Sequence, residues 1–161
     1  MSFKTADLSD NHPDQVSILS PGLQVYGGAK TFWGEVVTVR VLEDNVLVRK
    51  ALSEDGHGKV LVVDGGGSPK CALIGVCMAK LASEKGWAGV VIYGYIRDTK
   101  ELQDFDFGVR ALGSHPKRSR KAGVGEIRTP VEFLGTKIKT GQFIYADQDG
   151  VLVSDEKLAL E

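Results

Sequence analysis

Two apolar runs, Lys59-Val-Leu-Val-Val-Asp64 and Trp87-Ala-Gly-Val-Val-Ile-Tyr-Gly94, lie on either side of a helical segment. Their apolar residues are continuous rather than alternating, which indicates strands buried on both faces of a mostly parallel sheet. Between them, residues 76–85 carry apolar side chains at helical spacing, and this helix is expected to begin at Gly75, a tolerated N-cap. A strand, a loop, a helix and a second strand in this order form a right-handed βαβ unit. The sequence therefore predicts an α/β fold.

Further elements are expected on both sides of this unit. The β-branched residues of 34–42 predict another strand, and a helix through about Leu52, capped by Asp44 or Asn45, should follow it. In the C-terminal third, glycine turns separate short predicted strands at 130–134, 136–139, 142–146 and 151–153. The expected architecture is a single α/β domain over residues 1–161, with a βαβ core and antiparallel C-terminal strands.

The composition is that of an ordinary globular protein and excludes several classes. The chain of 161 residues has 20 Lys+Arg against 21 Asp+Glu and thus lacks the basic excess of most nucleic-acid-binding proteins. No apolar run approaches the roughly 20 residues of a membrane span, and residues 1–7 lack the apolar region of a secretory signal. The two cysteines, Cys71 and Cys77, are too few for a disulfide framework or a zinc site. We expect a cytoplasmic protein that binds neither membranes nor, directly, nucleic acid.

Three features are expected to meet at the carboxyl ends of the strands, where ligands gather in open α/β sheets. Gly65-Gly66-Gly67 follows the first strand of the βαβ unit, the backbone N–H groups after Gly75 open its helix, and Arg97-Asp98 follows its second strand. The N–H groups at a helix N-terminus carry partial positive charge and bind carboxylates or phosphates. An arginine next to an oxygen ligand suits a substrate carboxylate that is chelated by Mg²⁺. The sequence therefore indicates a small anionic ligand.

Each of these features also has a purely structural interpretation. The triple glycine matches neither a Walker P-loop nor a dinucleotide-binding register and could be only a tight turn. Asp98 with Glu101 three residues later fits a capping box, so its carboxylate could cap a helix instead of holding a metal. The basic run His115–Lys121, flanked by Arg110 and Arg128, could contact RNA or an acidic protein. Because no aromatic residues are interleaved with it, a solvated loop is the favoured interpretation of that run.

Several longer motifs resemble the RraA-like family, which comprises the regulator of ribonuclease E activity A and the class II 4-hydroxy-4-methyl-2-oxoglutarate aldolases. The resemblance covers nearly the whole chain, in order. It rests on Glu43-Asp44-Asn45, residues 62–68, residues 86–94, Arg97-Asp98, residues 107–113 and residues 145–151. It implies a compact swivelling β/β/α-type domain that assembles as a homotrimer, or as a hexamer of two trimers, with sites near the subunit interfaces.

The resemblance also implies a site and a reaction. In the aldolase branch of the family a divalent metal, usually Mg²⁺ or Mn²⁺, holds a small 2-oxo acid. By this resemblance Arg97 contacts the substrate and Asp98 anchors the metal. The substrate carboxylate is expected to lie against the backbone N–H groups of Gly75, Val76, Cys77 and Met78. The implied reaction is cleavage of 4-hydroxy-4-methyl-2-oxoglutarate to pyruvate, and decarboxylation of oxaloacetate would pass through the same pyruvate enolate.

Some residues of this chain depart from the aldolase branch of the family, whereas another departs from the regulator branch. Aldolases of this family usually have an aspartate where this chain has Val76, and a valine cannot move a proton. They also receive an acidic residue from a longer C-terminal extension of a neighbouring subunit, which has no evident counterpart in a chain ending at Glu161. The regulator branch, in turn, often lacks the aspartate that is Asp98 here.

The leading interpretation is a metal-dependent aldolase and decarboxylase acting on small 2-oxo acids. The alternative is a non-catalytic protein that binds and inhibits ribonuclease E, or binds RNA helicases, and so lowers RNA turnover. A third name attached to the family is menaquinone methyltransferase. It is rejected because the sequence lacks a convincing nucleotide-binding register.

Overall fold

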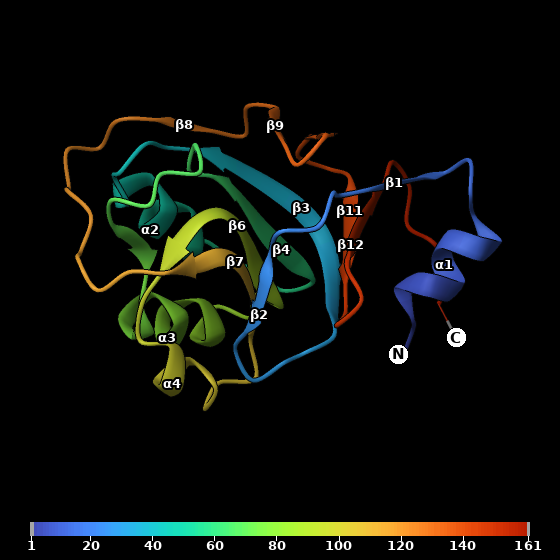
Figure 1. The fold of residues 1–161 in the computed structure, drawn as a ribbon, viewed down its shortest axis with the longest axis horizontal. Helices are drawn as coiled ribbons and strands as arrows, with labels where there is room; N and C mark the ends of the chain where they lie inside the picture. The colour runs from blue at the N-terminus through green and yellow to red at the C-terminus, as the bar shows by residue number, and fades with distance from the viewer. Residues whose placement is uncertain (1, 161) are drawn as a thin grey trace.

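The computed structural model describes residues 2–160 and contains a large mixed sheet with helices α2, α3 and α4 on one face (Figure 1). The helices are α1 (Thr5–Asn11), α2 (Val46–Leu52), α3 (Val76–Glu84) and α4 (Thr99–Leu102). The strands are β1 (Val16–Ile18), β2 (Gln24–Tyr26), β3 (Phe32–Arg40), β4 (Lys59–Asp64), β5 (Ala72–Ile74), β6 (Gly89–Ile96), β7 (Gly108–Ser114), β8 (Glu126–Ile127), β9 (Val131–Phe133), β10 (Thr136–Ile138), β11 (Phe143–Ala146) and β12 (Val151–Ser154). No helix within residues 2–160 is long and apolar enough to cross a membrane.

The centre of the sheet is parallel and its margins are antiparallel. The strands lie in the order β1-β12-β11-β3-β4-β6-β7-β2, and the pairs β3–β4, β4–β6 and β6–β7 are parallel. β4 and β6 pair from Val60 opposite Gly89 to Asp64 opposite Tyr93, and α3 lies between them in the sequence. The predicted βαβ unit is therefore confirmed.

Strand β4 is buried on both faces, as its continuous apolar sequence predicts. Each of the four residues from Val60 to Val63 is 0% exposed. Leu61 and Val63 belong to a core that includes residues of the helices α2, α3 and α4, whereas Val60 and Val62 belong to a second core with residues of β9, β11 and β12. Burial of one such side chain stabilises the fold by about 1.5–3 kcal/mol. β4 therefore contributes side chains to the cores on both faces of the sheet.

The C-terminal strands form the antiparallel annex that the sequence predicts. β9 and β10 make a separate hairpin in which Phe133 pairs with Thr136. The two residues between them, Leu134 and Gly135, have φ of 48° and 75°, as the central residues of a type I′ turn do. β11 pairs with β3 on one side and with β12 on the other, and β1 extends the sheet beyond β12.

Strands β1, β2, β5, β7 and β8 are not predicted by the sequence, in which Arg110 of β7 was expected to flank the basic run. The structure corrects this: Arg110 is 1% exposed, and its guanidinium carbon lies 5.1 Å from the centroid of the Phe32 ring. It donates hydrogen bonds to the carbonyl oxygens of Lys30, Val109 and Asp147. Burial lowers the pKa of Arg110 to about 10. Arg110 is therefore an interior cation and not part of a basic surface.

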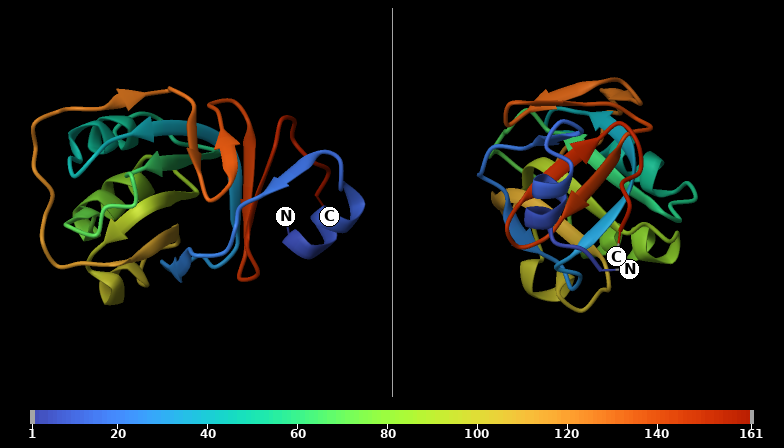
Figure 2. Two further views of the ribbon diagram at one scale, coloured as in Figure 1. Left: turned by 45° about the horizontal axis from the view of Figure 1, so that its top comes forward. Right: turned by 90° about the vertical axis from the view of Figure 1, so that its right-hand side faces the viewer.

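Helix α1 packs outside the sheet, next to the C-terminal end of the chain (Figure 2). Asp147 holds it there, because its two carboxylate oxygens accept hydrogen bonds from the backbone N–H and the hydroxyl of Thr5, both at 2.7 Å. The same carboxylate accepts the N–H groups of Asp149 and Gly150. Burial raises the pKa of Asp147, but these hydrogen bonds lower it by more, so the pKa lies below its usual value. Asp147 therefore joins the N-terminal helix to the turn between β11 and β12.

Candidate functional site

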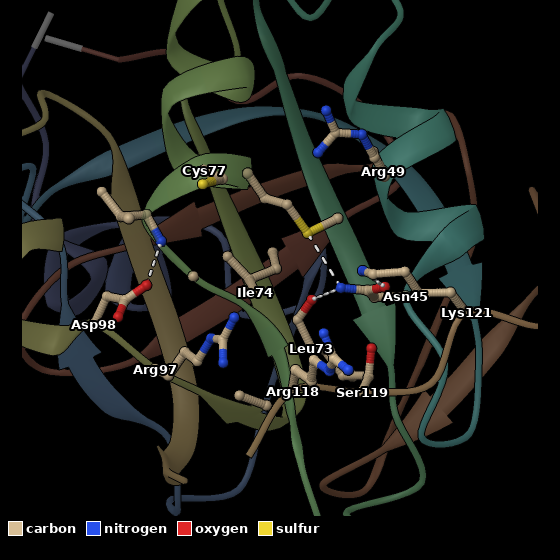
Figure 3. A pocket seen from close by; sticks show the side chains of 14 residues that line it. Asn45, Arg49, Leu73, Ile74, Cys77, Arg97, Asp98, Arg118, Ser119 and Lys121 are labelled. Carbon is tan, nitrogen blue, oxygen red and sulfur yellow. Dashed lines mark hydrogen bonds between the residues drawn. The ribbon is translucent and has the colours of Figure 1, made fainter. Parts of the chain in front are cut away.

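A pocket of about 240 Å³ opens where β5 and β6 end and α3 begins (Figure 3). Residues 72–78, which comprise β5, Gly75 and the first turn of α3, form one wall, and the two residues after β6 form another. Asn45, Arg49, Arg118, Ser119 and Lys121 line the remainder. The structure thus brings together the six residues that the resemblance implies for a site: Gly75, Val76, Cys77, Met78, Arg97 and Asp98.

Asp98 caps α3, on the opposite wall of the pocket, and not α4, the helix that it directly precedes. It occupies the N-cap position of α4 but makes no side-chain hydrogen bond there. Its Oδ2 instead accepts the backbone N–H of Val76, the first residue of α3, at 2.9 Å. The capping-box interpretation is therefore wrong, since the carboxylate caps a helix that begins 22 residues earlier. The other oxygen, Oδ1, has no hydrogen-bond partner within residues 2–160 and is available to a ligand.

The backbone of Asp98 has a conformation that side chains rarely adopt. Its φ of 61° and ψ of 39° are left-handed, which costs roughly 1–2 kcal/mol for most residues, although aspartate tolerates it better. Such strain persists only where neighbouring structure fixes it, and it is frequent at functional sites. Here the N–H of Arg97 donates to the Ile74 carbonyl at 2.9 Å, and the Asp98 carbonyl accepts the N–H of Leu102 at 3.0 Å. These bonds hold the Asp98 backbone on both sides.

Gly75 leaves the space that the Asp98 carboxylate needs. A Cβ at residue 75 would lie 2.6 Å from Asp98 Oδ2 and 3.2 Å from Arg97 Cγ. We expect Gly75→Ala to displace both side chains and to lower Tm. It should also weaken the binding of oxalate, a dianion that mimics the pyruvate enolate, about tenfold or more, as misplacement of binding groups does. Gly150→Ala is the matched control, because nothing lies within 4 Å of a Cβ at that glycine. Calorimetric titration of both variants would decide, and unchanged oxalate affinity in Gly75→Ala would contradict this site.

Arg97 points into the pocket from the end of β6 (Figure 3). Its Nη1 donates to the carbonyl oxygen of Pro116 at 3.3 Å. Within residues 2–160 no carboxylate forms a salt bridge with it. Since a guanidinium has five N–H donors and one neutral acceptor is present, most of its hydrogen-bonding capacity remains for a ligand. Arg97 is therefore a half-buried cation with free donors for an anionic ligand.

The first turn of α3 supplies backbone donors to the same space. The first N–H groups of any helix have no acceptor within the helix. The N–H of Val76 is taken by Asp98, whereas those of Cys77 and Met78 have no acceptor in the described part of the chain. Of the four residues expected to bind a carboxylate through their amides, these two therefore have free donors inside the pocket.

The triple glycine lies outside this pocket and is a turn. The N–H groups of Gly65 and Gly67 both donate to the Tyr93 carbonyl, and the N–H of Gly66 donates to Asp64 Oδ1. Their amides are thus used within the fold. Of the three features expected to meet, the structure brings together the helix start and Arg97-Asp98 but not the triple glycine.

The basic run, favoured as a solvated loop, in fact supplies part of the pocket. Arg118 and Lys121 line it from the orange loop that follows β7 in Figure 1. The N–H of Ala72 donates to the Lys117 carbonyl at 2.7 Å and ties this loop to β5. Lys121 Nζ donates to Asn45 Oδ1 at 3.2 Å. One signal could have located the run: it follows a parallel strand, and the carboxyl ends of parallel strands meet at one edge of a sheet.

The donor set decides what kind of metal site is feasible. Asp98 is the one carboxylate lining the pocket, and residues 2–160 contain no group of three or more His, Cys, Asp or Glu side chains that could hold a metal. Four cations face the same space: Arg49, Arg97, Arg118 and Lys121. They attract a dianion and disfavour a free divalent cation. Mg²⁺ commonly takes one or two protein carboxylates and completes its shell with water and substrate oxygens. The residues therefore fit a divalent ion only in company with an anionic ligand, and Asp98 is the carboxylate that would hold it.

Comparisons with known proteins agree with one another on the family. A family model named RraA-like and described as Aldolase/RraA matches residues 5–153. A Burkholderia multivorans protein, provisionally named a 4-hydroxy-4-methyl-2-oxoglutarate aldolase, is 51% identical over 163 residues, which cover 98% of this chain and 99% of that protein.

Two solved structures are also very similar to this chain. One, described as the RNA-processing inhibitor RraA from Thermus thermophilis, has a TM-score of 0.95 at 47% identity and covers 99% of this chain and 96% of its own. The other is described as S-adenosylmethionine: 2-dimethylmenaquinone methyltransferase from Geobacillus kaustophilus HTA426. It has a TM-score of 0.95 at 46% identity and covers 97% of both chains. From the family match and these near-complete similarities we conclude that the chain belongs to the RraA-like family, Aldolase/RraA.

Proposed function

We propose that this protein is a metal-dependent aldolase that cleaves 4-hydroxy-4-methyl-2-oxoglutarate and also decarboxylates oxaloacetate. The observation that carries the proposal is the pairing of Arg97 and Asp98 with the free N–H groups of Cys77 and Met78 in one cationic pocket. Close relatives that are provisionally named for this aldolase, at 49–51% identity, support the same reaction. The catalytic residues in this proposal are Arg97 and Asp98.

The reaction breaks the C3–C4 bond of the substrate. The C4 hydroxyl loses its proton, C4 becomes the ketone of one pyruvate, and the bonding electrons pass to the 2-oxo group to form a pyruvate enolate. Protonation at C3 then gives the second pyruvate. A divalent cation such as Mg²⁺ or Mn²⁺, when bound with the substrate at Asp98, supplies a Lewis acid for this chemistry.

The protein's own groups bind the substrate and stabilise the developing charge. The N–H groups of Cys77 and Met78 donate hydrogen bonds to the carboxylate next to the ketone, as helix N-termini do. Arg97 donates to the oxygen on which negative charge develops. No lysine forms a covalent intermediate in this scheme. The side chain of residue 76 cannot take the C4 proton because it is a valine, so water must take it.

Oxaloacetate passes through the same enolate by a simpler route. Its C3–C4 bond breaks with release of CO₂, and no hydroxyl proton has to be removed. The absence of a base at Val76 therefore affects decarboxylation less than aldol cleavage. We expect oxaloacetate to be the faster of the two substrates.

The second carboxylate of either substrate has suitable partners on the far side of the pocket. Arg118 and Lys121 line that side, and neither forms a salt bridge within residues 2–160. Both substrates are dicarboxylates, so a cationic site at each end complements their charge. S-adenosylmethionine, in contrast, carries a sulfonium cation that these side chains repel. We therefore do not extend the methyltransferase name of one similar structure to this chain.

Pyruvate release tests the proposal directly. Purified protein is mixed with 4-hydroxy-4-methyl-2-oxoglutarate or with oxaloacetate, in Mg²⁺ or Mn²⁺ and separately in excess chelator. Metal-dependent pyruvate formation above the protein-free rate is the expected result. Rates at the protein-free background in both substrates would refute it.

A second candidate function is inhibition of ribonuclease E by direct binding. It is favoured by one observation, the 47% identity and TM-score of 0.95 to the structure described as an RNA-processing inhibitor. Under this function the chain binds the ribonuclease without turning over a small molecule. Titration of this protein into a ribonuclease E cleavage assay, with and without chelator, distinguishes the two. Inhibition that is insensitive to chelator, without pyruvate formation, supports the regulator.

We also propose that the working form is a homotrimer or a hexamer of two trimers in the cytoplasm. Strands β1 and β2 are at the ends of the strand order and leave unpaired backbone groups, which a neighbouring subunit can cover. The exposed thiol of Cys77 is compatible with a reducing compartment. Light scattering at micromolar concentration should give at least three times the chain mass of 17.3 kDa. A stable monomer at that mass contradicts this assembly.

A further inference from the structure

Asp44 is a fully buried carboxylate that binds four backbone N–H groups. It is 0% exposed. Its Oδ1 accepts the N–H of Val46 at 3.1 Å and so caps α2. Its Oδ2 accepts the N–H groups of Ala122, Gly123 and Val124 at 2.9, 2.9 and 3.4 Å. One side chain therefore joins the start of α2 to a loop nearly eighty residues later in the sequence.

Three consecutive N–H groups that converge on one oxygen form a backbone nest, an arrangement that commonly binds an external anion. Gly123 has a φ of 82°, which lets the chain fold back on itself at this point. Here the anion is Asp44 of the same chain. Burial raises the pKa of this carboxyl, but its backbone hydrogen bonds together lower the pKa by more. The group is therefore ionised near neutral pH.

The loop held by Asp44 carries two of the four cations that line the pocket. Arg118 and Lys121 precede the nest by a few residues and line the pocket. Residues 120–126 are all exposed, so no buried apolar side chain anchors this part of the loop. Its other links include backbone hydrogen bonds with Ala72, Glu43 and Asn45, the bond from Lys121 to Asn45, the bonds from Arg97 to the Pro116 carbonyl and from Arg120 to the Leu42 carbonyl, and the ion pair of Arg40 with Glu126. Among these links Asp44 is the one buried carboxylate, and it alone accepts three N–H groups of the loop.

We propose that Asp44 is a positioning residue for the pocket. By accepting the N–H groups of residues 122–124, it holds Arg118 and Lys121 where they bind the distal carboxylate of a dicarboxylic 2-oxo acid, the carboxylate farther from the ketone. The proposal rests on the proposed function insofar as it takes this pocket to be the site for 2-oxo acids. It does not depend on turnover, because its content is the binding of an anion. It assigns Asp44 no contact with the ligand.

Two ligands that differ only in the distal group test this assignment. Pyruvate and 2-oxoglutarate share the 2-oxo acid head, but only 2-oxoglutarate has a second carboxylate. In Asp44→Asn the side chain retains one acceptor oxygen and gains an NH₂ group, which must face either the nest or the N–H of Val46. If the NH₂ group faces the nest, the loop loses its three hydrogen bonds to residue 44, and if it faces Val46, the nest loses the charge of its acceptor. In both cases the loop is held less firmly, and misplaced binding groups lose affinity. In calorimetric titrations with Mg²⁺ we expect the Kd of 2-oxoglutarate to rise about tenfold and that of pyruvate to change less than about twofold.

Asp147→Asn is the matched control. Asp147 also uses a carboxylate to hold backbone N–H groups, at Thr5, Asp149 and Gly150, but it does not line the pocket. Its replacement should lower Tm and leave both affinities unchanged. Equal loss of both ligands in Asp44→Asn, or the same split in Asp147→Asn, would show a merely structural role and overturn the proposal.

A second variant keeps the test decisive if Asp44→Asn does not fold. Gly123→Ala strains the nest through its φ of 82°, while the added Cβ meets only Val46 Cγ1, at 3.7 Å. It should show the same split between the ligands with a smaller amplitude. Wild-type protein that binds 2-oxoglutarate no better than pyruvate also overturns the proposal. Wild-type protein that binds 2-oxoglutarate better but forms no pyruvate from its substrates refutes the aldolase and leaves the role of Asp44 standing.

Discussion

Asp98→Ala is expected to abolish metal-dependent pyruvate formation, with a loss of at least about 10²-fold in kcat, because the proposed metal would lose the one carboxylate that lines the pocket. The same change removes the cap of α3, since Asp98 Oδ2 accepts the N–H of Val76 at 2.9 Å. Loss of a helix cap typically destabilises a protein by about 1 kcal/mol. The alanine variant therefore combines a chemical and a structural effect. Initial rates with Mg²⁺ and thermal unfolding measure them separately.

Asp98→Asn separates these two effects. An asparagine can still accept the N–H of Val76 through its side-chain oxygen, and it tolerates the left-handed backbone of residue 98. It removes only the negative charge. We expect Tm near the wild-type value and a metal-dependent rate as low as that of the alanine variant. A rate near wild type in Asp98→Asn would show that the carboxylate is only a helix cap.

The core of this fold could be predicted because it depends on local patterns. The continuous apolar residues of β4 and β6 and the helical spacing of α3 reflect burial that each segment undergoes along its own length. β2 and β5, in contrast, are three residues each and exist because a neighbouring strand offers hydrogen bonds. β7 was missed because it carries Arg110, whose burial depends on Phe32 and on carbonyl groups from distant loops. No local pattern contains that information.

The same distinction holds for the site. The first turn of α3 and the pair Arg97-Asp98 could be named from the sequence, since both follow from where strands end. That Asp98 caps α3 could not, because the capping box with Glu101 is the better local match and only the tertiary structure places Val76 beside the carboxylate. The part played by Arg118 and Lys121 depends on backbone hydrogen bonds to Ala72 and to the Glu43–Asn45 segment. The sequence thus indicated the half of the pocket formed by α3 and Arg97-Asp98 and missed the half that carries Arg118 and Lys121.

Val76→Asp is expected to raise aldol cleavage by about 10²-fold or more, the usual contribution of a well-placed general base. Residue 76 begins α3 and lines the pocket directly beside Arg97 and Asp98. The existing Asp98 carboxylate, close to the backbone of residue 76, raises the pKa of the introduced carboxyl, whereas Arg97 and the N-terminus of α3 lower it. The introduced group is therefore expected to be ionised near neutral pH, as a base must be. The new side chain would therefore take the C4 proton that water must otherwise remove.

Two controls show whether a rate increase in Val76→Asp comes from proton removal: the comparison of the two substrates, and the amide variant Val76→Asn. Decarboxylation of oxaloacetate needs no hydroxyl proton removed, so Val76→Asp should raise it far less than aldol cleavage. Val76→Asn has the same shape without a titratable group and should give no increase with either substrate. In Val76→Asp the aldol rate should rise with pH as the introduced carboxyl loses its proton, a dependence that the asparagine variant lacks. If aldol cleavage stays at the wild-type rate while oxalate still binds, proton removal is not what limits this pocket, and the proposed mechanism is wrong at that step.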